Sequence, residues 1–265
     1  MMKSDLKLLA GTLAALSLAC TAAREETRPT PPPSPPVAAA PAAPPEPPST
    51  PDEPWRNEKP APLPTTPKFE PPVPTERKLK NGAMVLVAEN HALPLIAIDV
   101  VIKTGVNAEP ISKAGLAGFN MAMLDEGTKT RKSLEISAQL EDLAAELSGG
   151  AGMESSRLHL NCLAETLPQC LEILADVVQN PAYRPEDLER IRGLLLTSLE
   201  QKKGVPGVIA NDVAGRLLYG DKHPWGQPDG GTPATIKAIT RDDLARFHDT
   251  WFRPNNAIIS VAGDV

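Results

Sequence analysis

Alternation of apolar and polar residues predicts strands in the second part of the chain. The segments are LKNGAMVLVAEN (79–90), LIAIDVVIKTG (95–105), RLHLNCLAE (157–165) and NAIISVAGDV (256–265). The first predicts a hairpin that turns at Asn81-Gly82, a dipeptide typical of tight turns. The second is apolar on both faces, as a central strand is. The third places Cys162 on its apolar side and His159 on the opposite face.

Apolar residues spaced three and four apart predict helices between these strands. The segments are SLEISAQLEDLAAELSGG (133–150), TLPQCLEILADVVQN (166–180), PEDLERIRGLLLTSLEQKKG (185–204) and ITRDDLARFHDTWF (239–252). We expect the first helix to stop at Gly149, and the second to begin with a capping box of Thr166 and Gln169. In the second helix, one apolar face carries Leu171, Leu174, Ala175 and Val178. Because strands and helices are grouped rather than alternating, the pattern predicts an α+β domain with a mixed sheet covered by helices.

Proline divides the chain into two unlike parts. Twenty of the thirty prolines lie between Pro29 and Pro74. Residues 24–75 therefore predict a Pro-rich disordered linker, extending by about 3.1 Å per residue where it is polyproline-like. Residues 76–265 are enough for one domain with its own core.

The first 23 residues are typical of an export signal, with Lys3 and Lys7 before an apolar run at residues 8–19. That run is too short to span a bilayer as a helix. The sequence allows two ways of processing this signal. It is either a lipoprotein signal, in which Cys20 becomes the lipidated residue, or an ordinary signal that is cleaved after Ala23. We expect the lipoprotein signal, so that the protein is anchored in the cell envelope and faces the periplasm. Cys162 and Cys170 are expected to be buried free thiols.

The overall charge is acidic. The chain has 33 Asp and Glu residues against 27 Lys and Arg, and no basic stripe interleaved with aromatic residues. This argues against a nucleic-acid-binding protein.

One further segment, GLAGFNMAMLDEGTKT (115–130), is informative together with several other short sequence segments and their order along the chain. The others are LKNGAMVLVAEN, LADVVQNP, DLERIR, LLYGDKHPWGQPDGGT and WFRPNNAIISVAGDV. Together they resemble the first half of the pitrilysin/insulinase family of zinc metallopeptidases. The resemblance covers roughly residues 76–265, and it implies a metallopeptidase-like half-module whose full-length relatives enclose a chamber between two halves.

In active members of that family, the opening segment carries the motif H-x-x-E-H on a helix. Two histidines four residues apart grip one Zn²⁺, and the glutamate acts on the zinc-bound water. The ungapped alignment puts Gly118 and Ala122 at the histidine positions and Met121 at the glutamate position. The third ligand, a later glutamate, falls near Ser198. Glu200 points about 200° away from that position on a helix.

No other residues replace these ligands. The histidines are His91, His159, His223 and His248, and none has a partner at a spacing typical of a zinc site. Asp125 and Glu126 are expected to serve the helix end and the following turn. We therefore expect no metal and no cofactor.

These expectations favour a catalytically inactive homologue. Its partner is expected to be a zinc-bearing insulinase-family subunit or a peptide held at an exposed strand edge, with the membrane reached through the lipid at Cys20. Two alternatives remain open. One is a stand-alone envelope binding or scaffold lipoprotein, and the other is an active zinc peptidase with an unconventional site.

Overall fold

The computed structural model describes residues 58–59, 61, 70–228 and 230–265. The expected export signal, Cys20 and most of the expected linker lie outside these residues.

The described residues form one six-stranded sheet in the order β1-β2-β6-β3-β5-β4. The strands are β1 (Thr75–Lys78), β2 (Met84–Glu89), β3 (Leu95–Ile102), β4 (Glu146–Ala151), β5 (Ser156–Leu163) and β6 (Ala257–Gly263). β2 and β6 run parallel, and the other neighbours run antiparallel. The sheet is therefore mixed, as expected. β3 lies between β5 and β6, which confirms the predicted central strand.

The predicted hairpin turn is confirmed at Asn81-Gly82. The N–H of Leu79 donates to the carbonyl oxygen of Ala83, and that of Gly82 donates to Leu79. Gly82 has a φ of 94°, in the left-handed region that favours glycine.

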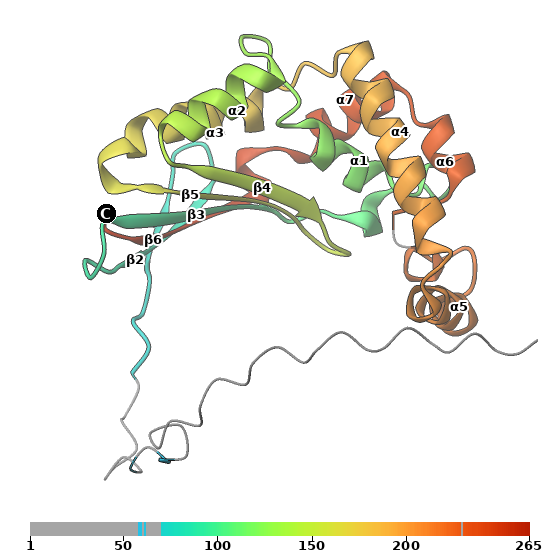
Figure 1. The fold of residues 1–265 in the computed structure, drawn as a ribbon, viewed down its shortest axis with the longest axis horizontal. Helices are drawn as coiled ribbons and strands as arrows, with labels where there is room; N and C mark the ends of the chain where they lie inside the picture. Colours follow the sequence, from blue (N-terminus) through green and yellow to red (C-terminus); the bar gives the residue numbers. More distant parts are fainter. Residues whose placement is uncertain (1–57, 60, 62–69, 229) are drawn as a thin grey trace, which may run out of the picture. The chain divides into compact units, whose positions relative to one another are not determined.

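Seven α-helices accompany the sheet in the described part of the chain. They are α1 (Leu116–Met123), α2 (Ser133–Asp142), α3 (Leu167–Gln179), α4 (Pro185–Lys202), α5 (Pro206–Tyr219), α6 (Pro233–Ala238) and α7 (Arg241–Trp251). In Figure 1, α2 and α3 cover one face of the sheet, while α1, α4, α6 and α7 gather at one end of it. This arrangement confirms an α+β fold.

Two hydrophobic clusters follow this arrangement. The first packs α2 and α3 on the sheet around residues such as Ile98, Leu160 and Ile173. The second packs α1 against α4, α6 and α7 around Phe119 and Leu244. The helix that aligns with the metallopeptidase motif therefore packs mostly in the second cluster, while its Met121 belongs to the first.

The expected helix at residues 133–150 is wrong in its second half. α2 ends at Asp142, and Leu147 and Gly149 belong to β4, which pairs with β5. The chain reverses at Ala144, whose φ is 49°. Pairing with a strand ten residues further on outweighs the local helical spacing, because it satisfies a row of backbone hydrogen bonds.

The expected capping box at Thr166 is also wrong. The Thr166 hydroxyl donates to the carbonyl oxygens of Leu143 and Leu163 and makes no cap bond to α3. By contrast, Thr240 is the N-cap of α7, where its side chain accepts from the N–H of Asp243. α5, α6 and β4 are elements that the sequence pattern missed.

Cys162 and Cys170 are buried free thiols, as expected. Burial, with the neighbouring Cys170, raises the pKa of the Cys162 thiol to about 12, which disfavours its thiolate. A separate finding concerns membranes: among the described residues, no helix combines the length and apolar character needed to cross a bilayer.

Candidate functional site

α1 begins at a tightly built turn. Gly115 has a φ of 94°, and a Cβ there would lie 2.6 Å from the carbonyl oxygen of Gly230, so only glycine fits. The buried carboxylate of Glu109 accepts hydrogen bonds from the N–H groups of Gly115 (2.6 Å) and Ala117 (2.8 Å). It satisfies two donors at the helix start and places negative charge at the positive end of the helix dipole. The sequence pattern gave no local signal for this role of Glu109.

The body of α1 is buried. Phe119 and Asn120 have no exposed surface, and the Arg192 guanidinium lies 5.4 Å from the centroid of the Phe119 ring. Asn120 Nδ2 donates to the Tyr183 hydroxyl oxygen (2.8 Å) and to the Leu244 carbonyl oxygen (3.0 Å). Burial raises the pKa of the Tyr183 phenol, which keeps it protonated. α1 is thus tied to α7 and to the loop before α4.

Asp176 of α3 holds the loop that follows α1. Its carboxylate accepts from the hydroxyls of Thr128 (2.6 Å) and Thr130 (2.7 Å), from Arg131 Nη1 (2.7 Å) and from Asn180 Nδ2 (2.9 Å). Burial acts to raise the pKa of Asp176, but these hydrogen bonds outweigh it and lower the pKa to about 2. The loop is therefore held by a carboxylate that stays ionised.

A cavity of about 270 Å³ lies where the family motif aligns. Met121 and Ala122 line it, together with Ile191 of α4 and residues 147–149 of β4. At Gly118 there is open space, because a Cβ added there would meet no neighbouring atom within 4 Å. A Cβ on Gly149 would lie 3.1 Å from Met121 Cε and 2.9 Å from the carbonyl oxygen of Arg157. Glycine at position 149 thus allows β4 to approach α1 closely.

Ser198 lies exposed on α4, which runs antiparallel to α1. Glu126, just after α1, accepts from Arg190 near the start of α4. At the other end, Gly115 at the start of α1 lies against Gly230, because a Cβ on Gly115 would lie 2.6 Å from the Gly230 carbonyl oxygen. Gly230 in turn lies next to Leu199 of α4, because a Cβ on Gly230 would lie 3.9 Å from Leu199 Cδ2. Ser198 is therefore on the part of α4 that faces the beginning of α1.

The residues at these positions do not fit a zinc ion. Zinc in proteins takes imidazole nitrogen, thiolate or carboxylate oxygen. Gly118 and Ala122 have no donor atom, Met121 offers a neutral thioether and Ser198 a hydroxyl. Within residues 58–59, 61, 70–228 and 230–265, no group of three or more His, Cys, Asp or Glu side chains could hold a metal.

Two carboxylates do line the cavity, Asp125 and Glu126. Glu126 is engaged by Arg190 and by the Ser133 hydroxyl, which donates to it at 2.9 Å. Loss of surrounding water raises the pKa of Asp125, although part of the residue remains exposed. Glu126 thus joins the end of α1 to α2 and α4, in line with the expected structural role.

The four histidines lie apart and have different partners. The pairs are His91 Nδ1 with Asp264 (2.6 Å), His159 Nδ1 with Asp99 (3.0 Å), His223 Nδ1 with the N–H of Trp225 (3.2 Å) and His248 Nε2 with the Val178 carbonyl oxygen (2.8 Å). No two of the four histidines share a partner.

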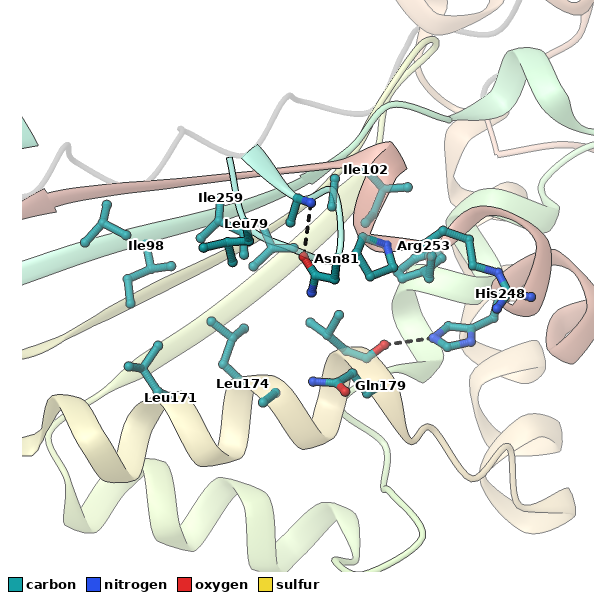
Figure 2. A pocket seen from close by; sticks show the side chains of 18 of the residues that line it. Leu79, Asn81, Ile98, Ile102, Leu171, Leu174, Gln179, His248, Arg253 and Ile259 are labelled. Carbon is teal, nitrogen blue, oxygen red and sulfur yellow. Dashed lines mark hydrogen bonds between the residues drawn. The ribbon is translucent and has the colours of Figure 1, made fainter. Parts of the chain in front are cut away.

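A larger cavity, of about 470 Å³, separates α3 from β3 and β6 (Figure 2). The apolar face predicted for α3, which carries Leu171, Leu174, Ala175 and Val178, lines it. Gln179, Asn81 and Arg253 lie at its polar side, and His248 donates from Nε2 to Val178 because a carbonyl can only accept. Burial lowers the pKa of His248. The cavity offers apolar space, and its histidine is already committed to the backbone.

Comparison with known proteins identifies the relatives of this chain. Residues 84–206 match the family model described as insulinase (peptidase family M16). An uncharacterized zinc protease of Rickettsia bellii is 28% identical over 188 residues, which is 71% of this chain and 45% of the relative. The mitochondrial-processing peptidase subunit beta of Rattus norvegicus is 27% identical over 187 residues, 71% of this chain and 38% of the relative.

Solved structures of related proteins also resemble the structure of this chain. A peptidase M16 inactive domain from Pseudomonas fluorescens matches with a TM-score of 0.69 and 27% identity, over 72% of this chain and 47% of that one. The periplasmic protease PqqL from Escherichia coli matches with a TM-score of 0.67 at 18% identity, over 76% of this chain and 23% of that one, and so shows a shared fold.

The fold defines a half-module of the metallopeptidase type. By sequence the chain is similar to the insulinase family, peptidase family M16, over residues 84–206, and its fold matches that of a peptidase M16 inactive domain. The chain spans less than half the length of the relatives described above.

Proposed function

We propose that this chain is a catalytically inactive insulinase-family homologue that serves as a non-catalytic subunit of a peptidase complex in the cell envelope. The observation that carries the proposal is the contrast within α1. Six of its eight residues are buried, whereas Gly118, Met121 and Ala122 supply neither a zinc ligand nor a general base. Without the metal there is no activated water to attack a peptide bond.

The edge of the sheet next to the cavity supports a peptide-holding role. β4 is the last strand in the sheet order, and among the described strands it pairs with β5 alone. An unpaired strand edge can bind an extended peptide through main-chain hydrogen bonds. Such a peptide would pass the cavity lined by Met121 and Ala122 and would not be cleaved by this chain.

The envelope location is part of the proposal and depends on residues 1–75. A signal at 1–23, lipidation of Cys20 and a spacer at 24–75 would hold the domain away from the membrane. One relative by fold, PqqL, is described as periplasmic. Mass spectrometry of the mature N-terminus tests the anchor: a lipid-modified Cys20 supports it, and an unmodified N-terminus at Arg24 contradicts it.

Co-purification from the native envelope tests the subunit role. The tagged full-length chain is expected to recover a second protein that bears an intact H-x-x-E-H motif. Peptidase activity is expected in that complex and not in the chain purified alone. Recovery of the chain without such a partner would contradict the subunit role and favour the stand-alone scaffold.

A further inference from the structure

The face of the sheet that α2 and α3 leave uncovered carries a row of three polar side chains, Ser148, His159 and Asp99. Ser148 of β4 lies directly opposite His159 of β5, and His159 lies directly opposite Asp99 of β3. Leu158 and Leu160, the neighbours of His159 in β5, belong to the core under α2 and α3, so the alternation of the strand turns His159 to the other face. Facing residues of adjacent strands have Cβ atoms about 4.5–5.5 Å apart. The three side chains are therefore neighbours in the order that a serine nucleophile, a base and an orienting carboxylate require.

Asp99 fixes the orientation of the histidine ring. His159 Nδ1 lies 3.0 Å from Asp99 Oδ1. Because a carboxylate can only accept, Nδ1 donates, and Nε2 keeps a lone pair that can take a proton. Nδ1 is turned toward β3, so the edge of the ring that carries Nε2 is turned toward β4 and Ser148. Arg157 Nε lies 3.8 Å from the same Asp99 oxygen and further restrains the carboxylate.

A substrate has room beside Ser148. This residue is exposed, lies in the edge strand β4 and lines the cavity of about 270 Å³ next to α1. The wall of that cavity is apolar at Met121 and Leu124 and acidic at Asp125 and Glu126. Apolar walls suit a short hydrocarbon acyl group, whereas the two carboxylates repel an anionic one. The cavity thus favours a small, neutral acyl compound.

The free edge of β4 supplies one hydrogen-bond donor for the oxyanion that such a reaction creates. Across the hairpin, the N–H of Gly152 donates to the carbonyl oxygen of Ser155 (2.7 Å). Hydrogen-bonded pairs alternate along an antiparallel ladder, so Ser148 and His159 form such a pair, and the N–H of Gly149 points away from β5. In hydrolases whose serine follows a strand, the N–H of the next residue helps to bind the oxyanion. A missing second donor costs about 10²–10³ in rate, which restricts this arrangement to esters, because an alcohol leaves more readily than an amine.

We propose that Ser148, His159 and Asp99 form a metal-independent acyl-transfer site that hydrolyses small neutral esters. Ser148 Oγ attacks the carbonyl carbon while its proton passes to His159 Nε2, and the bond to the alcohol breaks as the leaving oxygen takes that proton. Water then attacks the acyl-serine and gives a proton to Nε2, which returns it to Ser148 Oγ as the carboxylic acid leaves. Asp99 orients the ring and takes no proton. This activity goes beyond the proposed subunit role and does not depend on it.

Hydrolysis of p-nitrophenyl acetate by the purified full chain, with a chelator present, tests the proposal. Ser148→Ala and His159→Gln are each expected to lower kcat/KM at least about tenfold, and the double variant is expected to lower it no further, because the two residues act as a unit. Ser260→Ala is the matched control. Ser260 of β6 lies opposite Asp99 on the side away from His159, so its loss is expected to leave kcat/KM unchanged. Circular dichroism checks that all variants remain folded.

Covalent labelling gives a second readout at the serine itself. A fluorophosphonate reacts with serines that a neighbouring base activates. Mass spectrometry of the labelled wild-type chain is expected to find the probe on Ser148 and not on Ser260, and Asp99→Asn is expected to slow the labelling. Ester hydrolysis that is absent from the wild-type chain or survives Ser148→Ala, or a probe that does not modify Ser148, would overturn the proposal. Any of these results would leave the subunit role to be decided by co-purification.

Discussion

α1 and α5 use apolar residues in opposite ways. In α1, six of the eight residues are buried, and the ends of the helix segment are held by Glu109 and Glu126. In α5, none of the fourteen residues is buried, although the helix carries Ile209, Val213 and Leu217. Gly118, Met121 and Ala122 therefore belong to a helix that packs in the core, whereas α5 has an apolar face with no counterpart among the described residues.

This contrast separates two reasons for retaining an apolar helix. Residues of α1 contribute to the stability of the monomer, because they fill the core between α4, α6 and α7. Residues of α5 contribute little to that core, because none of them is buried.

The largest effect is expected at the centre of the α1 core. Phe119 has no exposed surface, so Phe119→Ala removes a ring and leaves a cavity, with an expected loss of about 3–5 kcal/mol in the free energy of unfolding. Urea denaturation followed by circular dichroism measures it. As a matched control, the exposed Leu134→Ala is expected to change stability by no more than about 0.5 kcal/mol. Equal losses in the two variants would show that α1 is not a core element.

A smaller effect is expected at the carboxylate that holds the loop after α1. The folded pKa of Asp176 is about 2, below its ordinary value of 3.8. Its ionised form therefore stabilises the fold above pH 3.8, and this contribution is lost as the pH falls through about 2. Asp176→Asn is expected to cost about 2 kcal/mol at neutral pH and to flatten the fall in stability between pH 4 and 2. An unchanged pH profile of unfolding would contradict the role of this carboxylate.

The smallest effect on stability is expected in α5. Leu217 is 82% exposed, so Leu217→Ala is expected to change the free energy of unfolding, measured by urea denaturation, by no more than about 0.5 kcal/mol. A loss of several kcal/mol in this variant would mean that α5 belongs to the core after all.

The parts of the fold that depend on local signals could be predicted from the sequence. The Asn81-Gly82 turn, the alternation of β5 and the N-cap at Thr240 each involve residues close in the chain. The helical character of α1 and the residues at its motif positions follow from the family resemblance rather than from local spacing. β4 could not be predicted in this way, because its pairing with β5 competes with a helical pattern that runs on from α2.

Other features depend on contacts that no local sequence pattern indicates. Glu109 caps a helix six to eight residues away, and Asp176 holds a loop more than forty residues before it. The predicted apolar face of α3 is real, yet Leu171, Leu174, Ala175 and Val178 line a cavity, while Cys170, Ile173 and Val177 fill the core beside Leu174. The spacing of apolar residues indicates which side of a helix is apolar, but not which part of that side is fully covered.

The most direct test of the inactive-homologue account is the zinc content of the purified full chain, measured by elemental analysis after exposure to excess zinc and removal of free metal. The wild-type chain is expected to hold far less than one zinc ion per chain and to cleave no peptide. The variant with Gly118→His, Met121→Glu, Ala122→His and Ser198→Glu, which restores the three ligands and the base, is the matched control and is expected to bind zinc. One zinc ion per wild-type chain, together with peptide cleavage that a chelator abolishes, would contradict the account.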